Sequence, residues 1–440
     1  MCAKRMSRRR LLLSLGLTGA LAGCTGTSDR NSGDETSTEG QPNENDTERG
    51  SDETETDDQS NNTNSQFDSF VTVDGTQLTL DDQPVYLFGT RPHFVMNFNE
   101  PAEWIEEMFD LMAQNGHTLA RVHAFQPCWG DESKQPQPGE VSEPVMQRLD
   151  RVIDTARTYG IRLSLMLINA KPALHISDGL DDNYGVNAHT YANYVDAAEE
   201  YDDFYTTREC IELYKQRVEA VLTRTNTITG VEYRNEPAIM MWELGNEIEY
   251  EEPWKHEDPS LRPWIEEVSA HVKSLDENHL VTTGEYAWAD RNNYLADHRP
   301  DTVDLCSIHY YPGPESYDLQ NDPERDHPGL LRDLIETGHQ EIGKPVYVGE
   351  YNWKVETGAE PPLEERNEQL RRMHEVFDET DVAAAAYHKL SLDEYHDWPR
   401  GGATTFGDSD DGSMEEFRRF ADIQSEKSAE GTLPERPPSR

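Results

Sequence analysis

The chain has 440 residues, enough for one large domain or two medium ones with additional tails. It carries 86 Asp and Glu against 39 Lys and Arg, so its formal net charge is −47, which argues against nucleic acid as a partner because phosphates would be repelled. A surface covered with carboxylates stays hydrated in strong salt, and we interpret the chain as a secreted protein of a halophile. An acidic linker attached to an ordinary domain is the alternative.

Residues 1–24 have the pattern of an export signal. Consecutive arginines in "SRRRLLLSLGLTGALAGC" resemble a twin-arginine signal, and the apolar run that follows is too short to span a bilayer comfortably. The ending "LAGC" looks like a lipoprotein box, so we expect a cell-surface lipoprotein that touches the membrane only through a lipid at Cys24. A cleaved signal without an anchor is the alternative.

Two segments are expected to be disordered. Residues 25–66 form an acidic linker with almost no apolar side chain, and residues 425–440 form a second polar tail. The folded domain is therefore expected over residues 67–424. Within it, the acidic runs "DDNYG" (181–185) and "DSDDG" (408–412) miss the EF-hand spacing, which favours solvated loops over calcium sites.

The folded domain begins with a hairpin signal and continues with alternating strands and helices. "SFVTVDGTQLTLDDQPVYLFG" alternates apolar and polar residues around Asp74-Gly75. Eight apolar strands follow, mostly separated by amphipathic helices: 84–89, 118–125, 161–169, 238–244, 279–285, 304–311, 345–351 and 382–390. This order predicts an α/β fold, a (β/α)8 TIM barrel with a short N-terminal β-hairpin. An open doubly wound sheet is the rival, but no Gly-X-Gly-X-X-Gly turn follows the first strand.

Polar residues gather where these strands end, which is where barrel enzymes place their chemistry. Two glutamates flanking one bond are what acetal hydrolysis requires, and aromatic side chains suit the apolar faces of sugar rings. Each residue alone could be a solvated carboxylate or a core side chain, so the hypothesis of an active site rests on several strand ends bringing such residues together. The candidates are Arg121, His123, Asn246, Glu247, His309, Tyr311, Glu350, Trp353 and His388, with Trp129, Trp242 and Trp288 adding to the aromatic content.

At these positions the chain resembles a known family. "WELGNE", "SIHYYP" and "VYVGEY" resemble the family 5 glycoside hydrolases. The longer run "FYTTRECIELYKQRVEAVLTRTNTITGVEYRNEPAIMMWELGNE" (204–247) is similar to the endo-β-1,4-mannanases of that family. The resemblance covers roughly residues 68 to 395.

The resemblance implies a retaining mechanism without cofactor or metal. Glu247 would be the acid/base, with a raised pKa, and Glu350 the nucleophile, with carboxyl groups about 5–5.5 Å apart. The resemblance also implies that Arg121 keeps Glu350 ionised, Asn246 binds a sugar hydroxyl, Tyr311 hydrogen-bonds Glu350 and His309 supports Glu247.

Several positions depart from the mannanase pattern. Ile248 stands where Pro is usual, His123 and Tyr387 or His388 stand where Trp is common, and "GTRPHF" replaces an Asn/Tyr-containing loop. These positions touch sugar, so the reaction type is expected to hold while the substrate stays open. We expect a monomer that acts on a β-linked polysaccharide or oligosaccharide, and mannan is the leading candidate substrate. Another β-glycan, or a carbohydrate-binding lipoprotein without catalysis, are the alternatives.

Overall fold

The computed structural model describes residues 67–92, 94–98, 100–125, 136–171, 186–286, 291–312, 326–353, 363–392, 405–406 and 411–436. The expected export signal (1–24) and linker (25–66) lie outside these ranges, as do Trp129, Trp288 and the acidic run 181–185. The second acidic run enters them only at its last two residues, where helix α11 begins.

A small antiparallel sheet precedes the main fold. Strands β1 (Val71–Asp74) and β2 (Gln77–Leu80) pair in register around the predicted turn, and β3 (Gln83–Pro84) pairs with β2. Gly75 in the turn has φ +62°, a conformation that glycine adopts at little cost. The predicted hairpin is therefore confirmed.

Eight parallel strands form the barrel. In spatial order they are β8 (Leu280–Thr282), β7 (Ile239–Glu243), β6 (Arg162–Met166), β5 (Leu119–His123), β4 (Leu87–Pro92), β11 (Ala384–Ser391), β10 (Val346–Tyr351) and β9 (Cys306–Tyr310). A bridge between Thr282 and Leu305 joins the two outer strands and closes the ring. The short β12 (Thr405–Phe406) pairs with β11 outside it. The predicted TIM barrel is confirmed.

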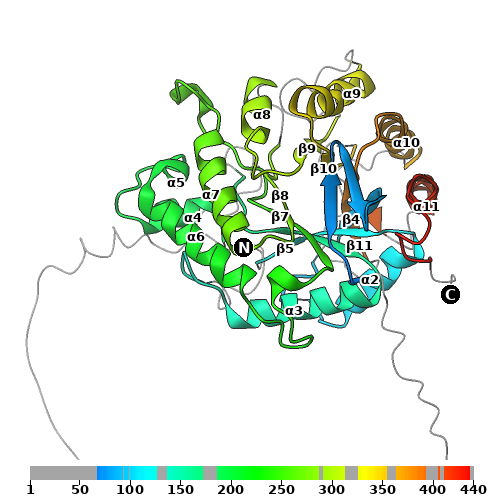
Figure 1. Cartoon of the computed structure of the whole chain (residues 1–440), viewed down its shortest axis with the longest axis horizontal. Helices are drawn as coiled ribbons and strands as arrows, with labels where there is room; N and C mark the ends of the chain where they lie inside the picture. The colour runs from blue at the N-terminus through cyan, green and yellow to red at the C-terminus, as the bar shows by residue number, and fades with distance from the viewer. Residues whose placement is uncertain are drawn as a thin grey trace, which may run out of the picture. The chain divides into compact units, whose positions relative to one another are not determined.

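Helices surround these strands (Figure 1). They are α2 (Trp104–Gln114), α3 (Glu143–Thr158), α4 (Ala188–Tyr194), α5 (Asp203–Thr206), α6 (Arg208–Leu222), α7 (Arg262–Leu275), α8 (Arg291–His298), α9 (His327–Thr337) with a π-helical extension (Gly338–Ile342), α10 (Leu363–Glu379) and α11 (Asp411–Lys427). Short 3-10 turns cover Tyr233–Asn235 and Pro253–Lys255. Among the described helices, none is long and apolar enough to cross a bilayer.

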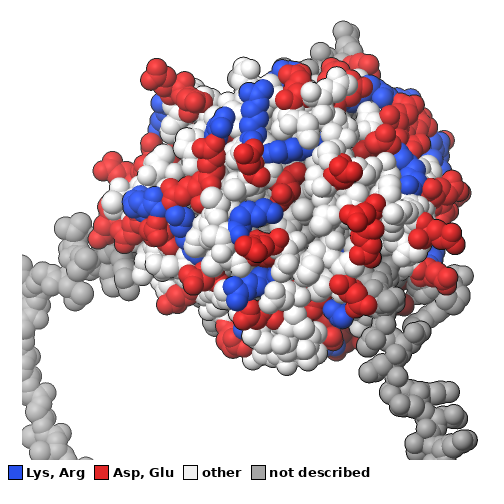
Figure 2. Space-filling view, in the orientation of Figure 1, with Lys and Arg blue, Asp and Glu red and all other residues white. Residues whose placement is uncertain are grey.

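The strands are buried on both faces, which explains their continuous apolar runs. Every residue of β6, β7, β9 and β10 is buried. Trp242 is part of this core, and its indole Nε1 donates to Asp276 Oδ2 at 2.7 Å. Most charged side chains lie at the surface, and Figure 2 shows Asp and Glu spread over the visible face. The few charged groups inside the barrel therefore need a specific reason to be there.

The expectation of a disordered tail from residue 425 is wrong. Helix α11 runs to Lys427, and the chain is described as far as residue 436. The Ala429 amide donates to Pro84 O at 2.9 Å, Leu433 packs against a core cluster, and Arg436 pairs with Asp422 at 2.7 Å. These contacts hold a segment whose Ser, Glu and Pro content suggested disorder.

Gly89 in β4 gives a prediction about the barrel itself. A Cβ at this position would lie 1.6 Å from the carbonyl oxygen of Leu119 on the neighbouring strand β5. Since backbone cannot move aside as a side chain does, Gly89→Ala is expected to lower the free energy of unfolding by about 3 kcal/mol or more. Thermal unfolding measures it.

The matched control is Gly75→Ala. A Cβ there meets nothing within 4 Å, so only the left-handed backbone costs energy, about 1 kcal/mol. Equal losses in the two variants would contradict the packing of β4 against β5.

Candidate active site

The loop after β7 holds Asn246 and Glu247 at the mouth of the barrel. The Asn246 amide donates to Ile168 O at 2.8 Å, and the Glu247 amide donates to Gly284 O at 2.7 Å. Glu247 has φ +53°, which is uncommon for a residue with a side chain and persists only where its surroundings enforce it. The ends of β6 and β8 thus fix the direction of the Glu247 side chain.

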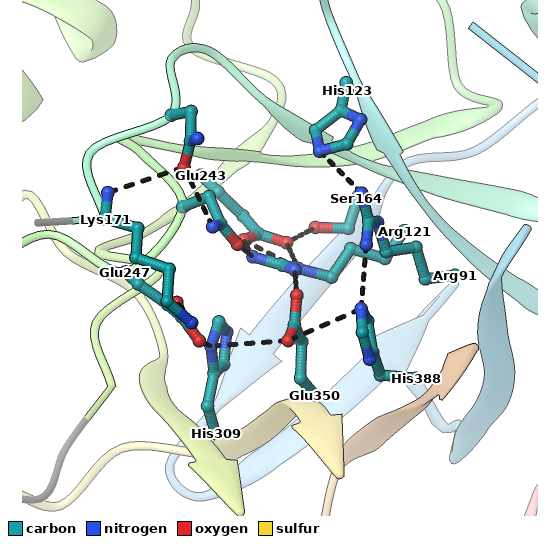
Figure 3. A network of polar contacts seen from close by, with 12 residues as sticks. Arg91, Arg121, His123, Ser164, Lys171, Glu243, Glu247, His309, Glu350 and His388 are labelled. Atoms are coloured by element: carbon teal, nitrogen blue, oxygen red, sulfur yellow. Dashed lines mark hydrogen bonds and ion pairs between the residues drawn. The ribbon is translucent and has the colours of Figure 1, made fainter. Parts of the chain in front are cut away.

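Glu350, near the end of β10, is held by two donors. Arg121 Nη1 donates to its Oε1, and the Tyr311 hydroxyl donates to its Oε2. Burial alone would raise the pKa of Glu350, but the neighbouring basic groups, with Arg121 in direct contact, hold it well below its ordinary value. Glu350 is therefore ionised at neutral pH, and both expected contacts are present, of which Figure 3 shows the one from Arg121.

Arg121 is itself oriented by a second carboxylate. Its Nε and Nη2 donate to the two oxygens of Glu243 at 2.9 and 2.7 Å, and Ser164 Oγ donates to Glu243 Oε1 at 2.5 Å. The Tyr347 hydroxyl adds a longer contact of 3.3 Å. Glu243 is the buried counter-ion of Arg121, and this explains why a glutamate ends β7 inside the barrel.

Asn246 links this network to the next loop. Its Oδ1 accepts from Arg121 Nη2 at 3.0 Å, and its Nδ2 donates to Asn169 Oδ1 at 3.1 Å. The amide orientation is thereby fixed beside the two glutamates. Its expected contact with a sugar hydroxyl remains a prediction.

Glu247 lies between two basic groups. His309 Nδ1 is 3.2 Å from Oε1, as expected, and Lys171 Nζ is 2.7 Å from Oε2. Burial would raise the pKa of Glu247, but Lys171 and His309 outweigh it and bring the pKa to about 2. The expected raised pKa of Glu247 is therefore wrong, because Lys171, in the loop after β6, pairs with this carboxylate.

The two glutamates lie close together. One oxygen of Glu247, one oxygen of Glu350 and a ring nitrogen of His309 all lie within 4.8 Å of one another. Inverting glycosidases separate their carboxyl groups by about 6.5–9.5 Å to admit a water, whereas retaining ones need about 5–5.5 Å. The spacing fits direct attack by one carboxylate on the anomeric carbon while the other carboxyl group protonates the departing oxygen.

The remaining candidates divide into a cluster and an outlier. Arg91, at the end of β4, contacts His388 Nε2 at 2.7 Å through Nη1 and His123 Nε2 at 3.1 Å through Nη2. His388 Nε2 is 3.9 Å from Glu350 Oε2. Trp353 instead lies edge-on to the His327 ring, with centroids 6.3 Å apart, and no described contact joins it to either glutamate.

An α/β barrel with two adjacent buried glutamates at its strand ends has the architecture of the retaining glycosidases. Residues 68–331, more than half of the chain, match the family described as "GH family 5 beta-mannosidase-like". The chain belongs to glycoside hydrolase family 5, in this β-mannosidase-like group.

Named relatives agree with the family. The chain is 33% identical over 323 residues to mannan endo-1,4-beta-mannosidase 4 of Oryza sativa, covering 66% of either protein. It is 29% identical to mannan endo-1,4-beta-mannosidase 7 of Arabidopsis thaliana, covering 67% of this chain and 70% of the relative. The first of these matches falls just short of two thirds of the relative's length.

A solved structure supports the fold. The endo-1,4-beta-mannanase of Rhizomucor miehei superposes with a TM-score of 0.65 at 23% identity, covering 81% of this chain and 100% of the other. At that identity the likeness concerns the barrel and says nothing on its own about the substrate.

Proposed function

We propose that this protein is a retaining glycoside hydrolase that cleaves internal β-1,4 bonds of a mannan-type polysaccharide. The observation that carries the proposal is the pair Glu247 and Glu350, with oxygens within 4.8 Å of each other. The family supplies the reaction class, and the relatives named for mannan cleavage supply the first substrate to test. Another β-glycan cleaved by the same two carboxylates is the second candidate, because Arg91, His123 and His388 differ from the usual sugar contacts.

The geometry gives each glutamate one task in each step. Glu350 attacks the anomeric carbon while Glu247 gives its proton to the departing glycosidic oxygen, which forms a glycosyl ester on Glu350. Water then attacks the same carbon, Glu247 takes a proton from it, and the Glu350 carboxylate leaves. Arg121 and Tyr311 stabilise the Glu350 carboxylate before and after the ester exists.

Lys171 makes the first step depend on pH. The basic limb of kcat/KM reports the pKa of the proton donor in the free enzyme. Lys171 and His309 lower the pKa of Glu247, and Glu350 raises it. Lys171→Gln removes a cation that favours the ionised form, so the pKa of Glu247 rises and the basic limb is expected to move to higher pH by about one unit or more.

The control for this pH prediction is Lys273→Gln. Lys273 pairs with Asp304 at 2.6 Å, on helix α7 and away from the glutamate pair. A basic limb that stays in place in Lys171→Gln, or moves as much in the control, would contradict the role given to Lys171.

The function itself is tested by reducing-sugar release from a panel of β-glycans in high salt, with wild type beside Glu350→Ala. Release from mannan or glucomannan that vanishes in the variant supports the proposal. Release from another β-glycan alone keeps the mechanism and overturns the mannan assignment. No release from any glycan, with sugar binding intact in both proteins, favours the carbohydrate-binding lipoprotein.

We also propose that the protein is exported by a twin-arginine route, anchored by a lipid on Cys24, adapted to high salt and monomeric. The arginines and the small-residue site before Cys24 support export and anchoring, and the net charge of −47 supports salt adaptation. Cys24→Ser should move the protein from the membrane fraction to the medium. Unchanged membrane association of this variant would contradict the anchor.

A further inference from the structure

Cations surround the glutamate pair of a protein whose net charge is −47. Arg121 is accounted for by its ion pairs with Glu243 and Glu350. Arg91 and Lys171 are not explained by the reaction above, which needs two carboxylates and a water. Arg91 lies near the end of β4 and Lys171 lies in the loop after β6, on either side of the two glutamates (Figure 3).

The hydrogen bonds of Arg91 go to imidazoles, while the Glu350 carboxylate favours its charge through space. The two hydrogen-bond partners of Arg91 among the described residues are the imidazoles of His123 and His388. Burial lowers the pKa of both imidazoles well below 6.5, so neither balances nor adds charge at neutral pH. Burial also lowers the pKa of Arg91, which shows that its charge is held at a desolvation cost, yet a guanidinium stays protonated at neutral pH.

The Arg91 cluster borders the reacting carbon. A sugar bonded to Glu350 must lie against His388, whose Nε2 is 3.9 Å from Glu350 Oε2. Arg91 Nη1 lies a further 2.7 Å from that same nitrogen. A substituent on the sugar ring therefore comes within reach of the guanidinium.

Lys171 approaches the pair from the opposite side. Its side chain is 33% exposed, and Nζ lies 5.8 Å from the centre of the Tyr286 ring. In the unliganded site its partner is Glu247, the group that must carry a proton for the first step. The same ammonium thus opposes the reaction unless something draws it away.

The charge balance of the site indicates which kind of ligand would separate Lys171 from Glu247. With Glu247 ionised, Arg91, Arg121 and Lys171 match the carboxylates of Glu243, Glu247 and Glu350 in number, and Glu249 is a further carboxylate that raises the pKa of Lys171. Among these six groups, protonation of Glu247 leaves one positive charge in excess, and Lys389 is a further buried basic group. A neutral sugar leaves that excess in place, whereas a sugar with one negative group removes it.

We propose that the sugar residue cleaved by this protein bears an anionic group, a carboxylate or a sulfate ester, recognised by Arg91 and Lys171. The inference rests on the proposed function and narrows its substrate to an acidic β-glycan of the mannan type. Binding of the anion turns Lys171 from Glu247 toward the substrate, so the acid/base gains its proton only when an anionic sugar is bound.

The test compares three polymers that share β-1,4-linked sugars of manno configuration. They are neutral mannan, mannuronan with a carboxylate on each residue, and chemically sulfated mannan, all at one salt concentration. The proteins are wild type, Lys171→Gln, Arg91→Gln and the control Lys273→Gln. Product mass shows addition of water, which separates hydrolysis from elimination.

Wild type is expected to cleave mannuronan or sulfated mannan with kcat/KM at least about tenfold above mannan. This ratio should fall by about tenfold or more in Lys171→Gln and in Arg91→Gln and hold in Lys273→Gln. A preference for mannuronan identifies a carboxylate, and one for sulfated mannan identifies a sulfate ester.

Two results would overturn the inference and leave the proposed function standing. One is cleavage of neutral mannan at least as fast as both acidic polymers. The other is an acidic preference that neither Lys171→Gln nor Arg91→Gln reduces. Failure of the proposed function looks different, because none of the polymers would then be cleaved by wild type.

Discussion

Glu350→Ala is expected to lower kcat on a cleaved β-glycan by about 10⁴-fold or more, because no other group can form the glycosyl ester. Loss of the carboxylate leaves Arg121 paired with Glu243, so the barrel should stay folded. Thermal unfolding checks this, and initial rates of reducing-sugar release measure the effect. Glu341→Ala, which removes a surface glutamate paired with Arg291, is the matched control.

External azide should restore part of the activity of Glu350→Ala on a substrate with a good leaving group. The small anion occupies the space of the lost carboxylate and attacks the same carbon once, so the product is an α-glycosyl azide. A Glu350→Ala protein that is folded and keeps more than about a tenth of wild-type activity would contradict the nucleophile assignment.

Glu247→Ala is expected to lower polysaccharide hydrolysis by about 10²- to 10⁴-fold, the range for loss of a general acid and base. An aryl glycoside with a good leaving group needs no proton in the first step, so its glycosyl ester should form quickly and then accumulate. Azide should intercept that ester and give a β-glycosyl azide, the opposite configuration from the Glu350 variant.

The pH profile separates Glu247 from a residue that merely supports the fold. The basic limb of kcat/KM should disappear in Glu247→Ala, because the titrating proton donor is gone. A basic limb that survives unchanged would assign the proton donor to another group.

Much of the fold follows from periodicity. Continuous apolar runs alternating with amphipathic helices require a parallel sheet covered on both sides, and β4 to β11 have that arrangement. The helix between the fifth and sixth predicted strands is short and covers only α8 (Arg291–His298). The prediction of a disordered C-terminal tail is wrong because contacts with Pro84 and Asp422 order this segment, and composition cannot reveal such contacts.

The sequence predicts the candidate site residues that lie in or directly after the barrel strands. Arg121, Glu247 and Glu350 meet because parallel strands bring their carboxyl ends to one mouth. Lys171 was missed because it follows β6 by several residues, in a loop whose partner lies on another strand end.

The pKa of Glu247 shows what one sequence leaves out. Two carboxylates that approach each other raise each other's pKa, and that was the expectation. The structure adds Lys171 at 2.7 Å, and a contact of this kind reverses the direction of the shift. Whether this carboxylate acts as an acid then depends on the substrate as much as on the protein.

The most direct test of the two-carboxylate account is the configuration of the first sugar released. Proton NMR of the anomeric signals, recorded in the first minutes of hydrolysis before mutarotation, separates the two outcomes. Glutamates with oxygens within 4.8 Å predict the β-anomer, because two displacements restore the starting configuration. The α-anomer would mean a single displacement by water and would contradict the roles of Glu247 and Glu350.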